Sequence, residues 1–394
     1  MTKLREIERL RACAILMVLV VHWRPLYVLM PEIARKSWSG VDLFFVISGY
    51  VVTLSLLRVL PTFDVKQPFL DAFAGSSGAL RTFYVRRFFR ILPPAVAAVF
   101  VHGLCTHYFP EQFGPTSLWK KEAVTIFGGM YNYSFVYNSD FRMGVYWSLA
   151  VEEHFYLLLP MIFILFRTTN RRLLACVIVG GISIACRLLP VPEGVGGYGW
   201  MKFTSHLRFD SLMAGVALAL LASKPSTPMV PRSWMRFAIV PALLLLVTCL
   251  PATAPDDVML HAGLIAIWGL SGALVALAGM DLGYVLSFPV LDRILEYIGS
   301  RSYALYVMHV PARGMELGAA ARWARFGTWC TPTDPDHPWR QLLVTAALAL
   351  FMTEVTHRLV EKPAMALGRR LIERAKHPSA PSGGAAIANA QEQA

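Results

Sequence analysis

The chain of 394 residues is 56% hydrophobic and only 16% charged, with a mean hydropathy of +0.50. These values exclude a soluble globular protein, a disordered chain and a disulfide scaffold, because soluble domains carry about a quarter charged residues. A net charge of +12 suggests a nucleic-acid partner, but the Lys and Arg residues lie in short segments between apolar runs, as topology signals do. The composition predicts a polytopic, all-α bundle in contact with the lipid bilayer and no nucleic-acid partner.

The first apolar run follows a basic stretch that contains Lys3, Arg5, Arg9 and Arg11. A signal peptide is one interpretation of this pattern. The run is about 20 residues long, which is enough to cross a bilayer, and no small-residue cleavage site follows it. We therefore predict an uncleaved first span at residues 10–29.

Nine further apolar windows of about 20 residues follow in chain order. They predict spans at 41–58, 88–109, 146–166, 172–189, 205–222, 237–253, 259–280, 297–318 and 339–360. Residues 118–137 are apolar enough to be an eleventh span, but Asn132, Asn138 and two glycines favour a loop or a re-entrant segment. The sequence thus predicts about ten spans.

Positive charge supports ten spans with both termini in the cytosol. In this topology the cytosolic segments hold 23 Lys and Arg residues and the outer segments hold 13, as the positive-inside rule requires. An eleventh span at 118–137 inverts every later loop and moves Arg167, Arg171 and Arg172 outside. We expect a membrane-embedded domain at 1–365 and a cytosolic, disordered tail at 366–394, which is of low complexity from His377 onward.

Ionisable residues inside predicted spans are energetically costly, so each is a candidate functional residue. At about 1.5 Å of rise per residue, a set of them converges on one layer of the outer leaflet: His22, Asp42, Glu152, Glu153, Arg208, Asp210 and His309. Any one of them could instead be a polar pair that holds helices together. Two histidines among carboxylates suit general acid–base chemistry. A metal site is the competing interpretation, but no zinc-type histidine spacing supports it.

A second, cationic layer lies at the cytosolic ends of the first and third predicted spans: Arg11, Arg86, Arg87 and Arg90. Ordinary topology anchoring explains these arginines equally well, although Arg87 and Arg90 share a helix face and can bind one anion. The spacing of Arg11 and His22 favours function. Eleven residues correspond to about 1,100°, within about 20° of three turns and with a rise of about 16 Å. A phosphate bound at Arg11 can therefore extend an arm to His22, as a long phosphorylated acyl carrier requires.

Seven motifs occur in order along the chain. They are Arg11 with ten residues to His22, Ser39-Gly-Val-Asp-Leu-Phe-Phe-Val-Ile-Ser-Gly-Tyr50, Arg87-Phe-Phe-Arg90, Trp147-Ser-Leu-Ala-Val-Glu-Glu-His-Phe-Tyr156, Arg208-Phe-Asp-Ser-Leu-Met-Ala-Gly215, Ser302-Tyr-Ala-Leu-Tyr-Val-Met-His309 and Glu361-Lys-Pro363. With them, residues 5–363 resemble the acyltransferase-3 integral membrane proteins, which O-acylate bacterial surface sugars and some antibiotics. His154 stands where that family usually has Gln. No SGNH-type esterase domain follows the last predicted span, so a stand-alone member is expected.

The resemblance implies a multi-pass acyltransferase of the bacterial cytoplasmic membrane that uses acyl-CoA, most simply acetyl-CoA, as co-substrate and holds no permanent cofactor. It places the CoA phosphates at Arg11, Arg86, Arg87 and Arg90 and makes His22 a general base or a transient acyl carrier. Glu153 and Asp42 are the expected partners of His22, with Glu152 a weaker choice. Arg208, Asp210 and His309 are expected to bind the acceptor, which is a cell-surface glycan or lipid-linked sugar or, alternatively, a small molecule such as a macrolide.

Two other functions fit a polytopic protein with intramembrane charges. A secondary transporter also places charged residues inside the membrane, but transporters commonly show paired repeats with broken helices, and this sequence shows no such symmetry. A receptor or structural membrane protein leaves the alignment of Arg11 with His22 unexplained.

Overall fold

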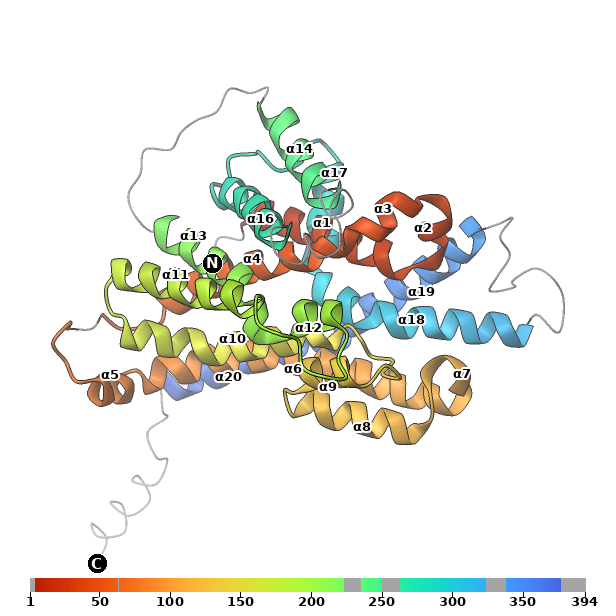
Figure 1. Cartoon of the computed structure of the whole chain (residues 1–394), viewed down its shortest axis with the longest axis horizontal. Coiled ribbons are helices and arrows are strands. Elements are labelled where there is room, and N and C mark those ends of the chain that lie inside the picture. The colour runs from red at the N-terminus through yellow and green to blue at the C-terminus, as the bar shows by residue number, and fades with distance from the viewer. Residues whose placement is uncertain (1–3, 63, 223–234, 250–262, 324–337, 377–394) are drawn as a thin grey trace, which may run out of the picture.

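The computed structural model describes residues 4–62, 64–222, 235–249, 263–323 and 338–376, and within these ranges it contains helices and no strands (Figure 1). The predicted all-α fold is confirmed. The helices of the first half are α1 (Arg5–His22), α2 (Arg24–Leu29), α3 (Pro31–Lys36), α4 (Gly40–Leu57), α5 (Phe69–Gly75), α6 (Ser77–Tyr108), α7 (Pro110–Phe113), α8 (Thr116–Phe127), α9 (Tyr131–Tyr137) and α10 (Tyr146–Leu165). Those of the second half are α11 (Thr169–Cys186), α12 (Gly197–Phe203), α13 (Phe209–Ala222), α14 (Met235–Cys249), α16 (Leu264–Gly279), α17 (Leu291–Ser300), α18 (Ser302–Trp323), α19 (Pro338–Thr356) and α20 (Lys362–Lys376). Short 3-10 turns cover Ser37–Ser39 and Ser205–Leu207, and a π turn covers His357–Glu361.

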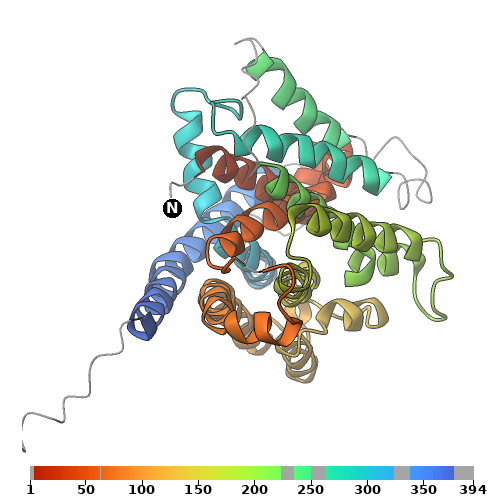
Figure 2. The same cartoon turned by 90° about the vertical axis from the view of Figure 1, so that its left-hand side faces the viewer.

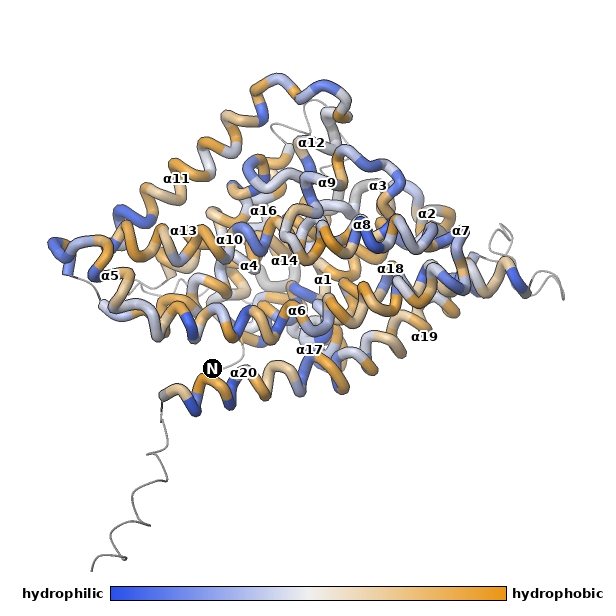
Figure 3. Tube along the Cα trace, turned by 90° about the horizontal axis from the view of Figure 1, so that it is seen from below, coloured by the Kyte–Doolittle hydropathy of each residue, from blue (hydrophilic) through white to orange (hydrophobic). Residues whose placement is uncertain are grey.

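Several of these helices can cross a membrane. Within the described ranges, five are long and apolar enough by length and composition: Ser37–Leu57, Ser77–Tyr108, Tyr146–Leu165, Thr169–Cys186 and Pro338–Ala375. Two shorter apolar helices, Phe209–Ala222 and Leu264–Gly279, accompany them. Figure 3 shows α11 and α13 as mostly hydrophobic. The chain is therefore a polytopic membrane protein, and the total of ten spans stays a prediction.

The long helices run side by side along the longest axis of the molecule. Helix α6 lies horizontally in Figure 1 and is seen nearly end-on in Figure 2. Helix α5 and the end of α20, both expected in the cytosol, lie at the left of Figure 1, whereas α3 and α7, both expected outside, lie toward the right. These two pairs of segments thus lie toward opposite ends of the bundle.

The first predicted span, 10–29, is interrupted at Trp23. Helix α1 ends at His22, Trp23 has extended backbone angles, and α2 begins at Arg24. Pro25 explains the break, because a proline lacks the N–H for an intrahelical bond and its ring clashes with the preceding turn. His22 therefore lies at the C-terminal end of a helix rather than inside one.

The segment 118–137 also departs from a continuous helix. Helix α8 ends at Phe127 and α9 begins at Tyr131, with Gly129 at a positive φ of 69° between them. Only glycine adopts this backbone region at low cost. The segment is thus two short helices rather than one eleventh span.

Helix α20 extends beyond the membrane domain expected from the sequence. It runs to Lys376, so residues 366–376 are helical, while 377–394 lie outside the described residues. Gly368 of α20 packs on Phe89 of α6, whose side-chain carbons lie 3.0 Å from the position of a Cβ at Gly368. This close contact favours a glycine and joins α20 to α6.

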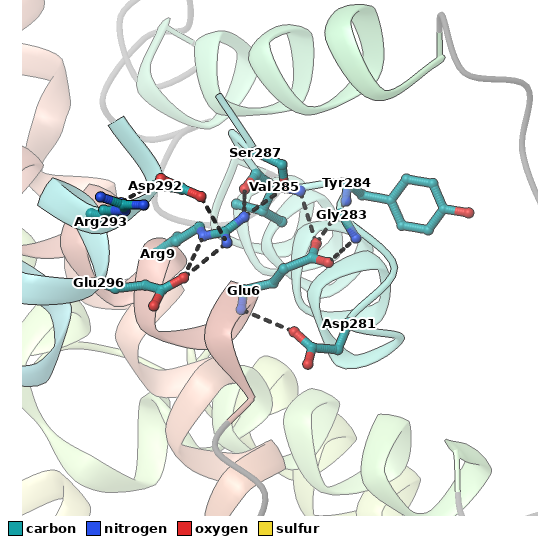
Figure 4. Close-up of polar contacts among 10 residues, drawn as sticks. All are labelled: Glu6, Arg9, Asp281, Gly283, Tyr284, Val285, Ser287, Asp292, Arg293 and Glu296. Carbon is teal, nitrogen blue, oxygen red and sulfur yellow. Dashed lines mark hydrogen bonds and ion pairs between the residues drawn. The ribbon is translucent and has the colours of Figure 1, made fainter. Parts of the chain in front are cut away.

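The start of α1 is fixed to the segment that leads into α17 (Figure 4). Glu6 accepts hydrogen bonds from the backbone N–H groups of residues 283–285. Arg9 donates to Glu296 of α17 at 2.8 Å and to the Val285 carbonyl at 3.1 Å. Charge-assisted bonds of this kind are roughly twice as strong as neutral ones. They hold the helix that carries Arg11 and His22 in a fixed position.

Helices α4 and α13 approach each other closely through two glycines. A Cβ on Gly49 of α4 would lie 2.1 Å from the Leu212 carbonyl oxygen, and one on Gly215 of α13 would lie 2.1 Å from that of Val46. Small residues at such crossings let two backbones touch. The contact brings Asp42, at the start of α4, beside the start of α13.

Candidate active site

A cavity of about 770 Å³, partly open to solvent, lies among α1, α4, α6, α10 and α18. Three arginines line it: Arg11, Arg87 and Arg90. The rest of the wall is mainly apolar, but it also carries one carboxylate and six hydroxyl groups, from Glu152, Ser48, Ser148, Tyr156, Ser302, Tyr303 and Tyr306. The cavity therefore offers concentrated positive charge beside an apolar, hydroxyl-lined passage.

The cavity arginines are short of anionic partners. Arg11 donates to Glu8 of its own helix at 2.8 Å. Arg87 stacks over the rings of Phe83 and Tyr156 at 5.9 and 5.8 Å, and its Nε is buried without a hydrogen-bond partner. In the described part of the chain, neither Arg87 nor Arg90 forms an ion pair. Guanidinium groups in this state fit a phosphate, which takes two parallel N–H bonds from one arginine.

Arg86 differs from its neighbours. Its side chain is exposed and is not part of the cavity wall. Consecutive helical residues point about 100° apart, so Arg86 and Arg87 leave α6 in different directions. Of the four arginines expected to hold phosphates, three share one cavity and Arg86 does not.

The two acids of α10 are separated in the same way. The Glu152 carboxylate lines the cavity and accepts a hydrogen bond from the Tyr156 hydroxyl at 2.6 Å. The half-buried Glu153 instead faces the α8–α9 turn, where its Oε2 lies 3.6 Å from the position of a Cβ at Gly129. Glu152, the weaker choice from the sequence, is thus the acid that shares the cavity with the arginines.

One ring nitrogen of His22 donates a hydrogen bond, and the other keeps its lone pair. Its Nδ1 lies 2.7 Å from the Val18 carbonyl oxygen, one turn back on α1, and its side chain is exposed. A carbonyl oxygen only accepts, so Nδ1 carries the hydrogen and Nε2 of the neutral ring keeps its lone pair. The tautomer of His22 is therefore that of a base or nucleophile at Nε2.

His309, on α18, is the nearest ring neighbour of His22. The two ring centroids are 4.9 Å apart with an interplanar angle of 66°. One turn earlier, Tyr306 lines the cavity, and its hydroxyl lies 2.5 Å from the Ser148 hydroxyl. No group of three or more His, Cys, Asp or Glu side chains in the described ranges could hold a metal ion. The two histidines thus stand next to the cavity without a metal cluster among the described residues.

A buried charge network occupies the interface of α4, α11 and α13. Arg208 forms an ion pair with Asp42, and Arg187 pairs with Asp210 at 2.5 Å. All four side chains are 1% exposed. Asp42 thus contacts Arg208, while the Val18 carbonyl is the group that fixes His22 Nδ1. Arg187 was not among the sequence candidates, although a charged residue beside an apolar run is a detectable signal.

Two further cations act on His22. Lys202 of α12 and Arg313 of α18 both interact with it electrostatically. Lys202 also lies 4.5 Å from the centroid of the Trp38 ring. Burial lowers the pKa of Lys202 to about 7, and Arg208 acts in the same direction. Neither cation belongs to a motif singled out in the sequence, so only the folded arrangement places them beside the histidine.

A family model described as an acyltransferase domain matches residues 4–353. The chain belongs to the acyltransferase-3 family. The resemblance found in its motifs is thereby confirmed over nearly the whole chain.

Curated relatives of this acyltransferase-3 protein are named as O-acetyltransferases. The peptidoglycan O-acetyltransferase of Listeria monocytogenes is 27% identical over 91% of this chain and 55% of its own length. A Bacillus subtilis protein, provisionally named a peptidoglycan O-acetyltransferase, is 26% identical over 93% of this chain and 56% of its own length. The chain spans just over half the length of these relatives. No solved structure matches it.

Proposed function

We propose that this acyltransferase-3 protein transfers an acetyl group from cytosolic acetyl-CoA to a hydroxyl group of a cell-surface or exported glycan. The observation that carries the proposal is the arrangement along α1. Arg11 opens into the cavity with Arg87 and Arg90, and His22, eleven residues later, ends the helix with its Nε2 available. The rise between them is about 16 Å, which suits an extended pantetheine arm.

The donor side of the proposal rests on charge. CoA carries phosphates, and three arginines in one cavity, two of them without an ion-pair partner among the described residues, form a site for such groups. The hydroxyls of the cavity wall and the carboxylate of Glu152 can bind the amide groups of the arm. The thioester then lies toward His22.

The acceptor side rests on exposure and on the neighbouring cations. His22 is exposed at the end of α1, where an acceptor hydroxyl can reach its Nε2. Attack of the hydroxyl on the thioester carbon develops negative charge on the carbonyl oxygen, and nearby cations stabilise such charge. Lys202 and Arg313 are the candidates for this role. His22 serves either as the base for the hydroxyl or as a transient acyl carrier.

The relatives guide the choice of acceptor. Because two of them are named for peptidoglycan O-acetylation, peptidoglycan fragments are the first acceptor class to test, and a macrolide is the second. Arg208 and Asp210, expected from the sequence to bind the acceptor, are instead committed to buried ion pairs. We therefore propose that Arg208 and Asp210 help to hold α4, α11 and α13 in position behind His22.

The test uses proteoliposomes of known orientation with radiolabelled acetyl-CoA on the side that bears the termini. Label should reach peptidoglycan fragments confined to the opposite compartment, and exchanging the two compartments should abolish transfer. His22→Ala should abolish transfer while acetyl-CoA affinity stays within about threefold, since the arginines remain. Wild-type turnover in a well-folded His22→Ala variant contradicts the assignment. Product only when donor and acceptor share a compartment contradicts the two-sided arrangement, and labelling of a macrolide alone identifies a small-molecule acceptor.

A further inference from the structure

His309 resembles His22 in how its ring is held. Its Nδ1 lies 2.7 Å from the Tyr306 carbonyl oxygen on the same helix. As in His22, this nitrogen must carry the hydrogen, because its partner only accepts. Both rings, when neutral, therefore hold their lone pair at Nε2. Each histidine is oriented as a proton acceptor by its own helix.

The surroundings of the two rings differ. The His22 side chain is exposed, whereas His309 is 0% exposed. The Nε2 of His309 is buried and has no hydrogen-bond partner in the described residues. Leaving a buried polar atom unpaired costs about 1–3 kcal/mol, so the atom calls for an explanation. Protonation of this nitrogen during turnover explains why it has no hydrogen-bond partner.

His309 also stands next to both sides of the proposed reaction. Its ring centroid is 4.9 Å from that of His22 and 5.9 Å from that of Tyr306, and Tyr306 lines the arginine cavity. The acceptor approaches His22, and the donor occupies the cavity. The buried imidazole of His309 thus lies beside His22, which the acceptor approaches, and beside Tyr306, which lines the cavity that the donor occupies.

The stoichiometry of acyl transfer requires a proton to move between those two sides. The O–H bond of the acceptor and the C–S bond of the thioester break, while a C–O ester bond and the S–H bond of free CoA form. The proton leaves an oxygen on the acceptor side and ends on a sulfur on the donor side. A positioned side chain that can both take and return a proton is needed for this transfer.

We propose that His309 is a catalytic residue that carries this proton, taking it at Nε2 from His22 and delivering it to the departing CoA thiolate. His22 first removes the hydroxyl proton, the alkoxide attacks the thioester carbon, and the thiolate leaves. The proton then passes from His22 to His309 and on to sulfur, which restores both neutral rings. If His22 instead carries the acyl group, the attacking hydroxyl gives its proton directly to His309. This inference rests on the proposed acyl transfer.

The decisive variant is His309→Asn. An asparagine amide can keep the hydrogen bond to the Tyr306 carbonyl that Nδ1 makes, but it has no basic nitrogen in place of Nε2. We expect kcat to fall by at least about 100-fold, the usual contribution of a positioned acid–base group, with the KM for acetyl-CoA within about threefold of wild type. A His309→Asn variant that keeps more than about a third of wild-type kcat overturns the proton role.

Chemical rescue separates a proton carrier from a packing residue. In His309→Ala, added imidazole should restore turnover in proportion to its concentration, whereas pyrazole, which has nearly the same shape but is a much weaker base, should not. Equal rescue by both compounds means that the ring only fills space and overturns the proposal.

A measurement on the unaltered protein avoids any effect on folding. Wild-type acyl transfer should be slower in heavy water than in light water, because the transferred proton moves in the rate-limiting step. Equal rates in the two solvents overturn the proton path. If the wild-type protein transfers no acetyl group at all, the proposed function itself fails, and this outcome is distinct from an active enzyme that is indifferent to His309.

Discussion

Two adjacent arginines of α6 carry the same charge but differ in their surroundings. Arg87 lines the cavity with its Nε buried and unpartnered, whereas Arg86 is exposed and outside the cavity wall. A hydrogen bond to a charged group contributes about 1.5–3 kcal/mol. Arg87→Ala should therefore raise the Kd for acetyl-CoA roughly 10- to 150-fold.

Removing the same charge at Arg86 should have little effect on the affinity for acetyl-CoA. An exposed charge contributes about 0–1 kcal/mol and is screened beyond about 8 Å at physiological salt. Arg86→Ala should change the Kd by less than about fivefold. Arg87→Lys, which keeps the charge but loses the planar pair of donors, should lie between the two alanine variants.

Equilibrium dialysis of radiolabelled acetyl-CoA against protein in nanodiscs at physiological salt measures all three affinities. Thermal unfolding of each variant in the same nanodiscs verifies that the bundle is intact. Equal losses for Arg86→Ala and Arg87→Ala would show that the cationic layer acts only as a general attraction. Unchanged affinity in both would make it a topology signal alone.

Three further predictions concern packing and charge. Gly215→Ala should lower the melting temperature strongly, because the new Cβ would lie 2.1 Å from a carbonyl oxygen of α4. As a control, Gly269→Ala should leave the melting temperature unchanged or raise it, because its Cβ meets nothing within 4 Å. Arg187→Ala should cost about 3–5 kcal/mol by leaving Asp210 buried and unpaired, and the double variant with Asp210→Ala should recover part of that loss in the same melting assay. Because the pKa of Lys202 is lowered to about 7, its positive charge is present below that pH and lost above it. Acyl-transfer rates should therefore fall as the pH rises above about 7, and Lys202→Arg, which stays charged, should hold the rate to higher pH; superimposable pH–rate profiles would refute a role for this charge.

Composition, hydropathy and motif order were enough to predict the class of fold and a set of candidate functional residues. Long apolar windows predicted where helices lie, since only helices satisfy the backbone within a bilayer. The described residues of the predicted spans are mostly helical, but 10–29 is divided between α1 and α2, and 297–318 between α17 and α18. The periodicity of 3.6 residues per turn placed Arg11 and His22 on one face of the first helix. The order of the motifs was enough to indicate the family, because those residues are read directly from the chain.

Which of these residues contact one another depends on how the helices pack. Helical periodicity says which side chains share a face but not which helix that face contacts. The packing of α6, α10 and α1 therefore selected Arg87 over Arg86 and Glu152 over Glu153 for the cavity. The same holds for the pairing of Asp42 with Arg208, 166 residues away, and of His22 with His309. These contacts join helices far apart in the sequence, and their geometry depends on glycine crossings and buried ion pairs that no local pattern encodes.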